Sequence, residues 1–93
     1  MYIIAVYDIN TETREGRRAL NKIFKLMKKY LIHIQKSVFE GELTKAQFQK
    51  MKLEVMQIID PDCDSVIYFS SRDSRWLDKE VHGLGKDTTD NFI

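Results

Sequence analysis

The chain begins with a nearly unbroken apolar run that ends at a carboxylate. Residues 2–7 (YIIAVY) are typical of a buried central strand, and Asp8 follows them directly. A carboxylate at the end of a core strand faces the edge of the interior, where metal ligands and catalytic bases are common. Aspartate also favours the turn that follows a strand. The strand alone therefore leaves Asp8 open between a turn residue and a site residue.

A long amphipathic helix is predicted over residues 13–30, capped at its start by Thr11 or Thr13. At about 100° per residue, one side of this helix is apolar and carries Leu20, Ile23, Phe24, Met27, Tyr30 and Leu31. The other side is basic and carries Arg14, Arg17, Arg18, Lys22, Lys25, Lys28 and Lys29.

Shorter elements follow this helix. Residues 32–35 and 37–40 are two extended pieces, which form either a tight hairpin or a single bent ribbon. Thr44 and Gln47 then fit a capping box, and Asp60-Pro61 ends the second helix. Its apolar stripe is Phe48, Met51, Val55, Ile58 and Ile59. Residues 65–70 form another apolar strand.

The element order β-α-β-β-α-β predicts an α+β fold, a ferredoxin-like sandwich with both helices on one sheet face. We expect one domain over residues 1–93, with a core of about residues 1–70. A short fifth strand is predicted at residues 75–77, and the C-terminal tail within 71–93 is expected to pack on another surface, such as a partner subunit. The uncovered sheet face makes a homodimer the expected assembly.

Composition places the chain among soluble proteins of a reducing compartment. The single Cys63 has no partner for a disulfide or a zinc site, and the start of the chain lacks a signal peptide. No stretch is long enough to span a membrane, so we expect a cytoplasmic location and no membrane partner.

The formal net charge of +1 conceals a strong asymmetry along the chain. Residues 14–36 hold eight basic residues, Lys36 among them, against Glu15 alone, which gives +7 there and −6 elsewhere. A charged stripe usually marks a solvated helix exterior. Because compensating acids are nearly absent here, the stripe favours a surface that binds a polyanion such as nucleic acid.

Several motifs together resemble a known family. They are an apolar strand ending in Tyr7-Asp8-Ile9, an arginine-rich helix, the segment QKSVFEG (residues 35–41) and the strand DSVIY (residues 64–68). Over nearly its whole length the chain resembles the second family of CRISPR-associated proteins, the small ferredoxin-like subunit of the spacer-acquisition machinery. One departure from the family pattern is His33, which we expect to be a structural residue. His82 is expected to be a surface residue of the tail.

The resemblance implies a prokaryotic homodimer that acts in CRISPR adaptation beside an integrase subunit. It implies a metal-dependent endonuclease acting on RNA or double-stranded DNA. Asp8 of each chain is then the catalytic residue and the ligand of Mg²⁺, or of another divalent cation such as Mn²⁺, and Ser37 and Phe39 match positions beside it. The residues expected to contact the nucleic-acid backbone are Arg14, Arg17, Arg18, Lys22, Lys25 and Lys36.

The chemistry of this arrangement is plausible but sparse. Hydrolysis of a phosphodiester needs an activated water and neutralisation of the charge on the phosphate, both of which Mg²⁺ supplies. The sequence offers no convincing second base. Two alternatives to a nuclease subunit therefore stay open: a non-catalytic DNA-binding scaffold that bridges the integrase, and a toxin-type ribonuclease outside CRISPR systems.

Overall fold

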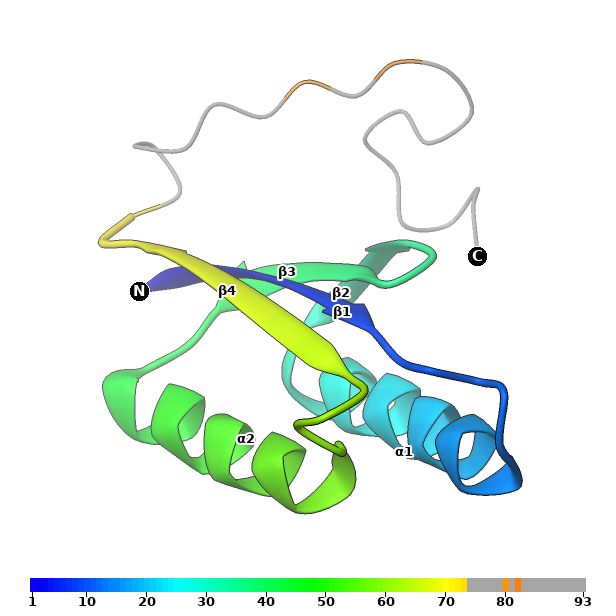
Figure 1. Cartoon of the computed structure of the whole chain (residues 1–93). Helices are drawn as coiled ribbons and strands as arrows, with labels where there is room; N and C mark the ends of the chain where they lie inside the picture. Colours follow the sequence, from blue (N-terminus) through cyan, green and yellow to red (C-terminus); the bar gives the residue numbers. More distant parts are fainter. Residues whose placement is uncertain (74–79, 81, 83–93) are drawn as a thin grey trace.

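Four strands and two helices alternate along the chain in the computed structural model, which describes residues 1–73, 80 and 82 (Figure 1). The elements are β1 (Tyr2–Asp8), α1 (Arg14–Tyr30), β2 (Ile32–Gln35), β3 (Val38–Glu42), α2 (Lys45–Ile58) and β4 (Ser65–Ser71). The predicted element order is confirmed. The predicted fifth strand at residues 75–77 and most of the tail lie outside the described residues.

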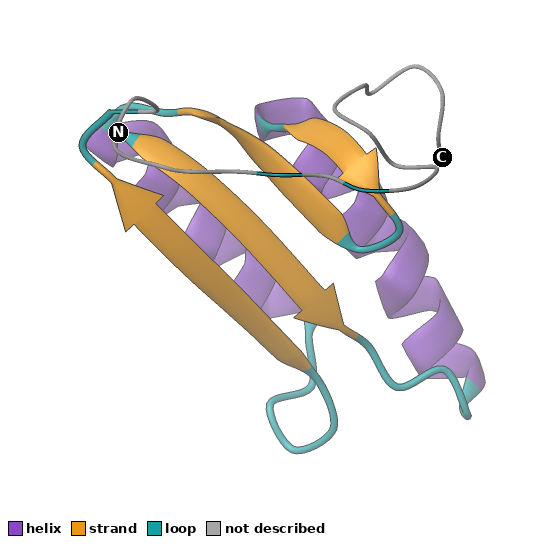
Figure 2. Cartoon of the chain, turned by 90° about the horizontal axis from the view of Figure 1, so that it is seen from above, coloured by secondary structure: helices purple, strands orange, loops and turns teal. Residues whose placement is uncertain are grey.

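The strands form one antiparallel sheet in the order β2-β3-β1-β4, with β1 paired to β3 on one side and to β4 on the other. The residues between the first two helices form a true β2–β3 hairpin and not a bent ribbon. Both helices cover the same face of the sheet, as Figures 1 and 2 show from two directions. The fold is therefore the expected ferredoxin-like α+β sandwich.

Strand β1 alternates between the two faces of the sheet. Ile3, Ala5 and Tyr7 are buried against the helices, while Ile4 and Val6 lie half-buried on the face opposite the helices, here called the open face. The apolar run predicted a buried central strand, and the predicted fold left the sheet face opposite the helices uncovered. Among the described residues, only one face of β1 is covered by helices.

Helix α1 begins where its side-chain cap predicts. Of the two candidate caps it is Thr13 whose hydroxyl accepts a hydrogen bond, at 2.9 Å, from the backbone N–H of Gly16. The helix buries Ile23, Leu26 and Met27. The predicted apolar stripe omitted Leu26, which lies at its edge and is 8% exposed.

The centre of the core is an aromatic cluster around Phe39, a fully buried side chain. Its ring lies 4.7 Å from His33, 5.5 Å from Phe24 and 6.0 Å from Tyr7, measured between ring centroids. Nε2 of His33 bonds the carbonyl oxygen of Lys36 at 2.7 Å. His33 therefore fills a packing position and holds the β2–β3 turn, in keeping with the structural role expected for it.

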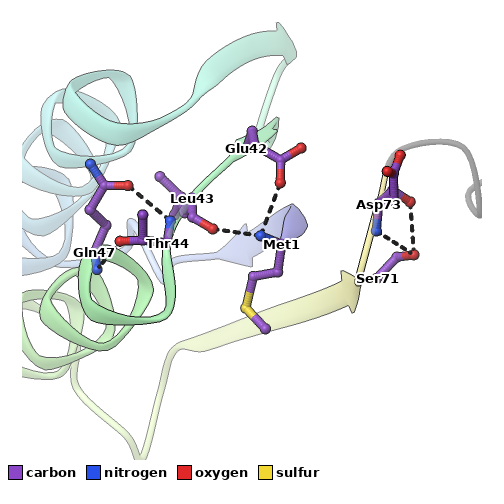
Figure 3. Close-up of polar contacts among 7 residues, drawn as sticks. All are labelled: Met1, Glu42, Leu43, Thr44, Gln47, Ser71 and Asp73. Atoms are coloured by element: carbon purple, nitrogen blue, oxygen red, sulfur yellow. Dashed lines mark hydrogen bonds and ion pairs between the residues drawn. The ribbon is translucent and has the colours of Figure 1, made fainter.

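Helix α2 begins with the predicted capping box, shown in Figure 3. The Thr44 hydroxyl accepts from the backbone N–H of Gln47, and the Gln47 side chain accepts from the backbone N–H of Thr44. Beside this cap the terminal ammonium of Met1 donates to the Leu43 carbonyl at 2.7 Å and pairs with Glu42 at 2.9 Å. These contacts fix the start of β1 against the connection from β3 to α2.

The two helices are joined by polar side chains as well as by the core. The Tyr30 hydroxyl donates a hydrogen bond to the Glu54 carboxylate, and Lys29 pairs with the same carboxylate at 3.4 Å. The hydrogen bond from Tyr30 is the main reason that the pKa of Glu54 lies below its usual value of 4.5. Within the described residues, no helix has the length and apolar character needed to cross a membrane.

The Tyr30–Glu54 contact predicts a pH-dependent stability. Tyr30→Phe is expected to lower the melting temperature at pH 7 by a few degrees, because the ionised Glu54 carboxylate loses its donor. The pKa of Glu54 is lowered by folding, so its contribution is present above pH 4.5 and is lost as the pH falls through the folded pKa. Thermal melts from pH 7 to pH 2 should show the two proteins converging below pH 4.5. A difference that stays constant over this range would contradict the assignment.

Candidate functional site

Asp8 is the last residue of β1 and its side chain is exposed on the open face. In the antiparallel ladder it lies directly across from Ser65, the first residue of β4, which is also exposed. Residues that oppose each other in such a ladder project on the same side of the sheet. The carboxylate of Asp8 and the hydroxyl of Ser65 therefore form a small polar group at one end of the open face.

The rest of the open face is mostly apolar, but Tyr2 and Glu40 also lie on it, and the Tyr2 hydroxyl donates a hydrogen bond to the Glu40 carboxylate. Next to the polar pair, Val6 lies across from Ile67 and Ile4 lies across from Phe69. Ile67 is 51% exposed and Phe69 is 55% exposed, which is unusual for side chains of this size on the middle of a strand. Ile32 of β2 adds a third large exposed side chain to the same face, since it opposes Glu40 in the ladder with β3. The polar pair thus borders an apolar strip that nothing in the described chain covers.

The β2–β3 turn lies at the same end of the sheet as Asp8. The backbone N–H of Tyr7 donates to the carbonyl oxygen of Ser37 at 3.2 Å, which extends the β1–β3 ladder to the turn. Lys36 is exposed in this turn and adopts a φ of 40°, in the left-handed region. Ser37 therefore contacts β1 through its backbone, and Lys36 places a positive charge at the end of the sheet where Asp8 lies.

Phe39 lies on the opposite side of the sheet from Asp8. It opposes Ala5 in the ladder, faces the helices and is fully buried. The structure does not bring its side chain beside the Asp8 carboxylate. Its contact is with the ring of Tyr7, the residue before Asp8, so Phe39 supports the end of β1 from within the core.

The basic side of α1 is exposed along its whole length. Arg14, Arg18, Lys22 and Lys25 are all exposed, and only the loop of residues 9–13 separates the first of them from Asp8. Arg17 differs from the others because its Nη1 donates to the carbonyl oxygen of Thr11 at 3.1 Å. The basic stripe therefore begins at the Asp8 end of the molecule, and Arg17 also holds the connecting loop.

The site is an open surface and not a pocket. A cavity of about 200 Å³ lies nearby, between the start of α1 and the connection from α2 to β4, but Asp8 is not among the residues that line it. An exposed carboxylate at a sheet end accommodates an extended polymer more readily than a small enclosed substrate.

One chain alone provides only part of the ligands that a metal site would need. Across the part of the chain that the structure describes, no three His, Cys, Asp or Glu side chains gather closely enough to hold an ion. Mg²⁺ prefers oxygen ligands and keeps several waters, so one or two carboxylates suffice when they face the same ion. Asp8 offers one exposed carboxylate with a hydroxyl across from it. The group fits a magnesium ion once a second carboxylate is brought to it.

The sequence predicted Asp8 as a site residue but did not identify Ser65 as its neighbour. The available signal was the fold itself: a ferredoxin-like sheet pairs its first and last strands antiparallel, so the residue that opens the last strand faces the one that ends the first. Ile67 and Phe69 belong to the apolar strand predicted over residues 65–70. They follow the same alternation and belong to the open face.

Comparison with known proteins gives a consistent result. Residues 1–79 match the family model described as CRISPR associated protein Cas2. The chain is 50% identical to the CRISPR-associated endoribonuclease Cas2 of Fusobacterium nucleatum, over all of this chain and 87% of that protein. It is 47% identical to the CRISPR-associated endoribonuclease Cas2 2 of Moorella thermoacetica, over 98% of this chain and all of that one.

Solved structures agree with the sequence comparison. The crystal structure of Streptococcus pyogenes Cas2 at pH 6.5 superposes with a TM-score of 0.74 at 34% identity, covering 88% of this chain and all of that chain. A second structure, described as a crystal structure of Cas2, gives a TM-score of 0.75 at 36% identity and covers 100% of this chain and 98% of that chain.

Proposed function

Because the chain belongs to the Cas2 family of CRISPR-associated proteins, we propose that it is a homodimeric, metal-dependent endonuclease that acts in CRISPR adaptation. The single observation that carries this proposal is the exposed Asp8 carboxylate at the end of the central strand, on a largely apolar sheet face that the described helices and strands leave uncovered. The names of its relatives, which are CRISPR-associated endoribonucleases, support the same class of reaction. The proposed substrates are RNA or double-stranded DNA.

In the proposed dimer the open faces of two chains pack against each other. Ile32 on β2 and Ile67 and Phe69 on β4 are each more than half exposed, and large apolar side chains left in water on one sheet face commonly mark a protein interface. A two-fold interface brings the same patch of both chains together. Since Asp8 ends this patch, the pairing would bring the two Asp8 carboxylates toward one another across the axis.

Each subunit would then contribute one carboxylate to a shared Mg²⁺ or Mn²⁺ site. The bound cation neutralises charge on the phosphate and lowers the pKa of a bound water. Asp8 would hold the ion, and the hydroxyl of Ser65 would offer a hydrogen bond to a water beside it. With no second base among the neighbours described above, the attacking water would lose its proton to bulk solvent, and slow turnover follows from this sparse apparatus.

The basic side of α1 is the proposed nucleic-acid surface. Exposed guanidinium and ammonium groups contact phosphates without reading bases, which suits a protein that acts on varied sequences. The proposed contacts are Arg14, Arg17, Arg18, Lys22, Lys25 and Lys36. A dimer doubles this surface, and we propose that an integrase subunit shares the bound DNA with it.

A second candidate function is a non-catalytic scaffold that binds DNA and bridges the integrase. The observation in its favour is that one chain brings a single carboxylate to the site, and the described part of the chain holds no cluster of three ligating groups. In that case Asp8 would shape the dimer interface alone. Family membership makes a toxin-type ribonuclease outside CRISPR the least favoured of the three interpretations.

Asp8→Asn separates the two remaining candidates. The variant keeps the shape of the side chain but loses the charge that holds a cation, so metal-dependent cleavage of RNA or duplex DNA is expected to fall at least about 100-fold. Binding to a duplex in the absence of metal should change less than about two-fold. Asp62→Asn, an exposed aspartate outside the open face, is the matched control and should cleave like the parent. Equal cleavage by the parent and Asp8→Asn would show that Asp8 is not the catalytic residue, and a parent protein that cleaves neither substrate would leave the scaffold as the function.

Charge reversal on α1 tests the nucleic-acid surface. Arg14→Glu with Arg18→Glu is expected to weaken duplex binding and to reduce the slope of log affinity against log salt by about 2 per chain, because two phosphate contacts are lost. The matched control is Lys45→Glu with Lys50→Glu, which makes the same change of charge on the exposed side of α2. If both double variants shift the slope equally, net charge and not this surface determines binding.

A charge placed on the open face tests the dimer. Phe69→Lys is expected to give a monomer in sedimentation experiments at micromolar concentration, because a buried ammonium without a partner opposes association. Mn²⁺ binding, measured by electron paramagnetic resonance, should be lost with the dimer. Met56→Lys is the control, since Met56 is 60% exposed on α2, away from the sheet. A Phe69→Lys protein that remains dimeric would place the interface elsewhere.

A further inference from the structure

The backbone that follows Asp8 is held by the side chain of a distant residue, Asp64. Its Oδ1 accepts a hydrogen bond from the backbone N–H of Asn10 at 2.8 Å, and its Oδ2 accepts one from the backbone N–H of Asp60, also at 2.8 Å. Hydrogen bonds to a charged acceptor are about twice as strong as neutral ones. One carboxylate thus joins the loop between β1 and α1 to the loop between α2 and β4.

The side chain and the carbonyl group of Asn10 are also fixed by contacts with neighbouring residues. Its side-chain oxygen accepts from the backbone N–H of Glu12 at 2.9 Å. Its carbonyl oxygen lies so close to Gly16 that a Cβ at position 16 would sit 1.8 Å from it, so only glycine fits there. Ile9, between Asp8 and Asn10, is buried in the core. The loop therefore leaves the end of β1 along a single fixed path.

These contacts fix Asp8 from both directions along the chain. On its strand side Asp8 is held in the ladder opposite Ser65, the residue immediately after Asp64. On its loop side, two residues further on, Asn10 is held by the Asp64 carboxylate. The last residue of a strand otherwise frays readily, whereas a metal ligand has to stay within about 0.5 Å of its working position.

We infer that Asp64 is a positioning residue for the Asp8 carboxylate: it sets the direction of the backbone through Asn10 and thereby the place of the proposed metal ligand. This inference rests on the metal-dependent activity proposed at Asp8. Both Asp64 oxygens already accept backbone hydrogen bonds, so Asp64 acts through the backbone and is not itself offered as a ligand.

The test compares Asp64→Asn with Asp62→Asn. Both variants remove one negative charge from the loop between α2 and β4. The Asp62 carboxylate makes no contact that joins this loop to Asn10. In Asp64→Asn, by contrast, the side-chain amide turns its N–H₂ group toward the backbone N–H of Asn10 or of Asp60, and one hydrogen bond is lost. In Asp64→Asn, hydrogen exchange at the Asn10 amide is expected to accelerate about 10-fold, and Mn²⁺ affinity to fall about 10-fold. Asp62→Asn should leave both unchanged. Asp64→Glu, which keeps the charge and both acceptors, should recover part of the affinity.

Three outcomes decide the matter. If Asp64→Asn binds Mn²⁺ and cleaves like the parent, well below its melting temperature, Asp64 is merely structural and the inference is overturned. Leu43→Ala, which thins the core at the end of the sheet opposite Asp8, controls for lost stability: an equal loss of Mn²⁺ affinity there also overturns it. If instead Asp8→Asn itself leaves Mn²⁺ binding intact, the proposed site fails first and the inference with it. Should Asp64→Asn not fold, Asp64→Glu decides: faster exchange at the Asn10 amide together with weaker Mn²⁺ binding supports the inference, and faster exchange with unchanged Mn²⁺ binding overturns it.

Discussion

The central strand β1 carries apolar side chains on both faces, and the described chain covers only one of them. Ile3, Ala5 and Tyr7 meet the helices, whereas Ile4 and Val6 lie beside the exposed Ile67 and Phe69. This imbalance explains why a domain with two helices and four strands leaves large apolar side chains in water. It also places Asp8 at the border of the uncovered surface. The proposed dimer and the proposed site are consequences of the same strand.

Local features of the sequence were predictable, and contacts between distant residues were not. The capping box of α2 follows from residues three apart, and the element order follows from periodicity alone. Phe39 was assigned to the neighbourhood of Asp8, but the alternation of β3 turns it into the core, where it meets Tyr7 instead. The contact of Asn10 with Asp64 joins residues 54 apart, and no local pattern announces it. It depends on strand pairing, which fixes both loops at one end of the sheet.

Binding and catalysis are assigned to different surfaces, and their physical requirements differ. The proposed binding stripe on α1 would act through many exposed charges, each replaceable, with a strength that depends on salt. The Asp8 site acts through one carboxylate whose position is set by a ladder and a clamped loop. Under this proposal, loss of the Asp8 carboxylate would leave the binding stripe intact, so the same fold could serve either as a nuclease or as a scaffold.

In the proposed dimer, metal and partner are linked through the charge of Asp8. Two carboxylates about 6 Å apart repel by about 3 kcal/mol at an effective dielectric constant of 20. Completing the burial of a half-exposed Ile or Phe contributes roughly 1 kcal/mol. Burial of Ile32, Ile67 and Phe69 from both chains therefore more than offsets the repulsion. The stabilisation that remains is small compared with the entropic cost of association. A cation between the carboxylates turns the repulsion into attraction, so an ion that binds the pair must also stabilise the dimer, and dimerisation must raise the affinity for the ion by the same factor.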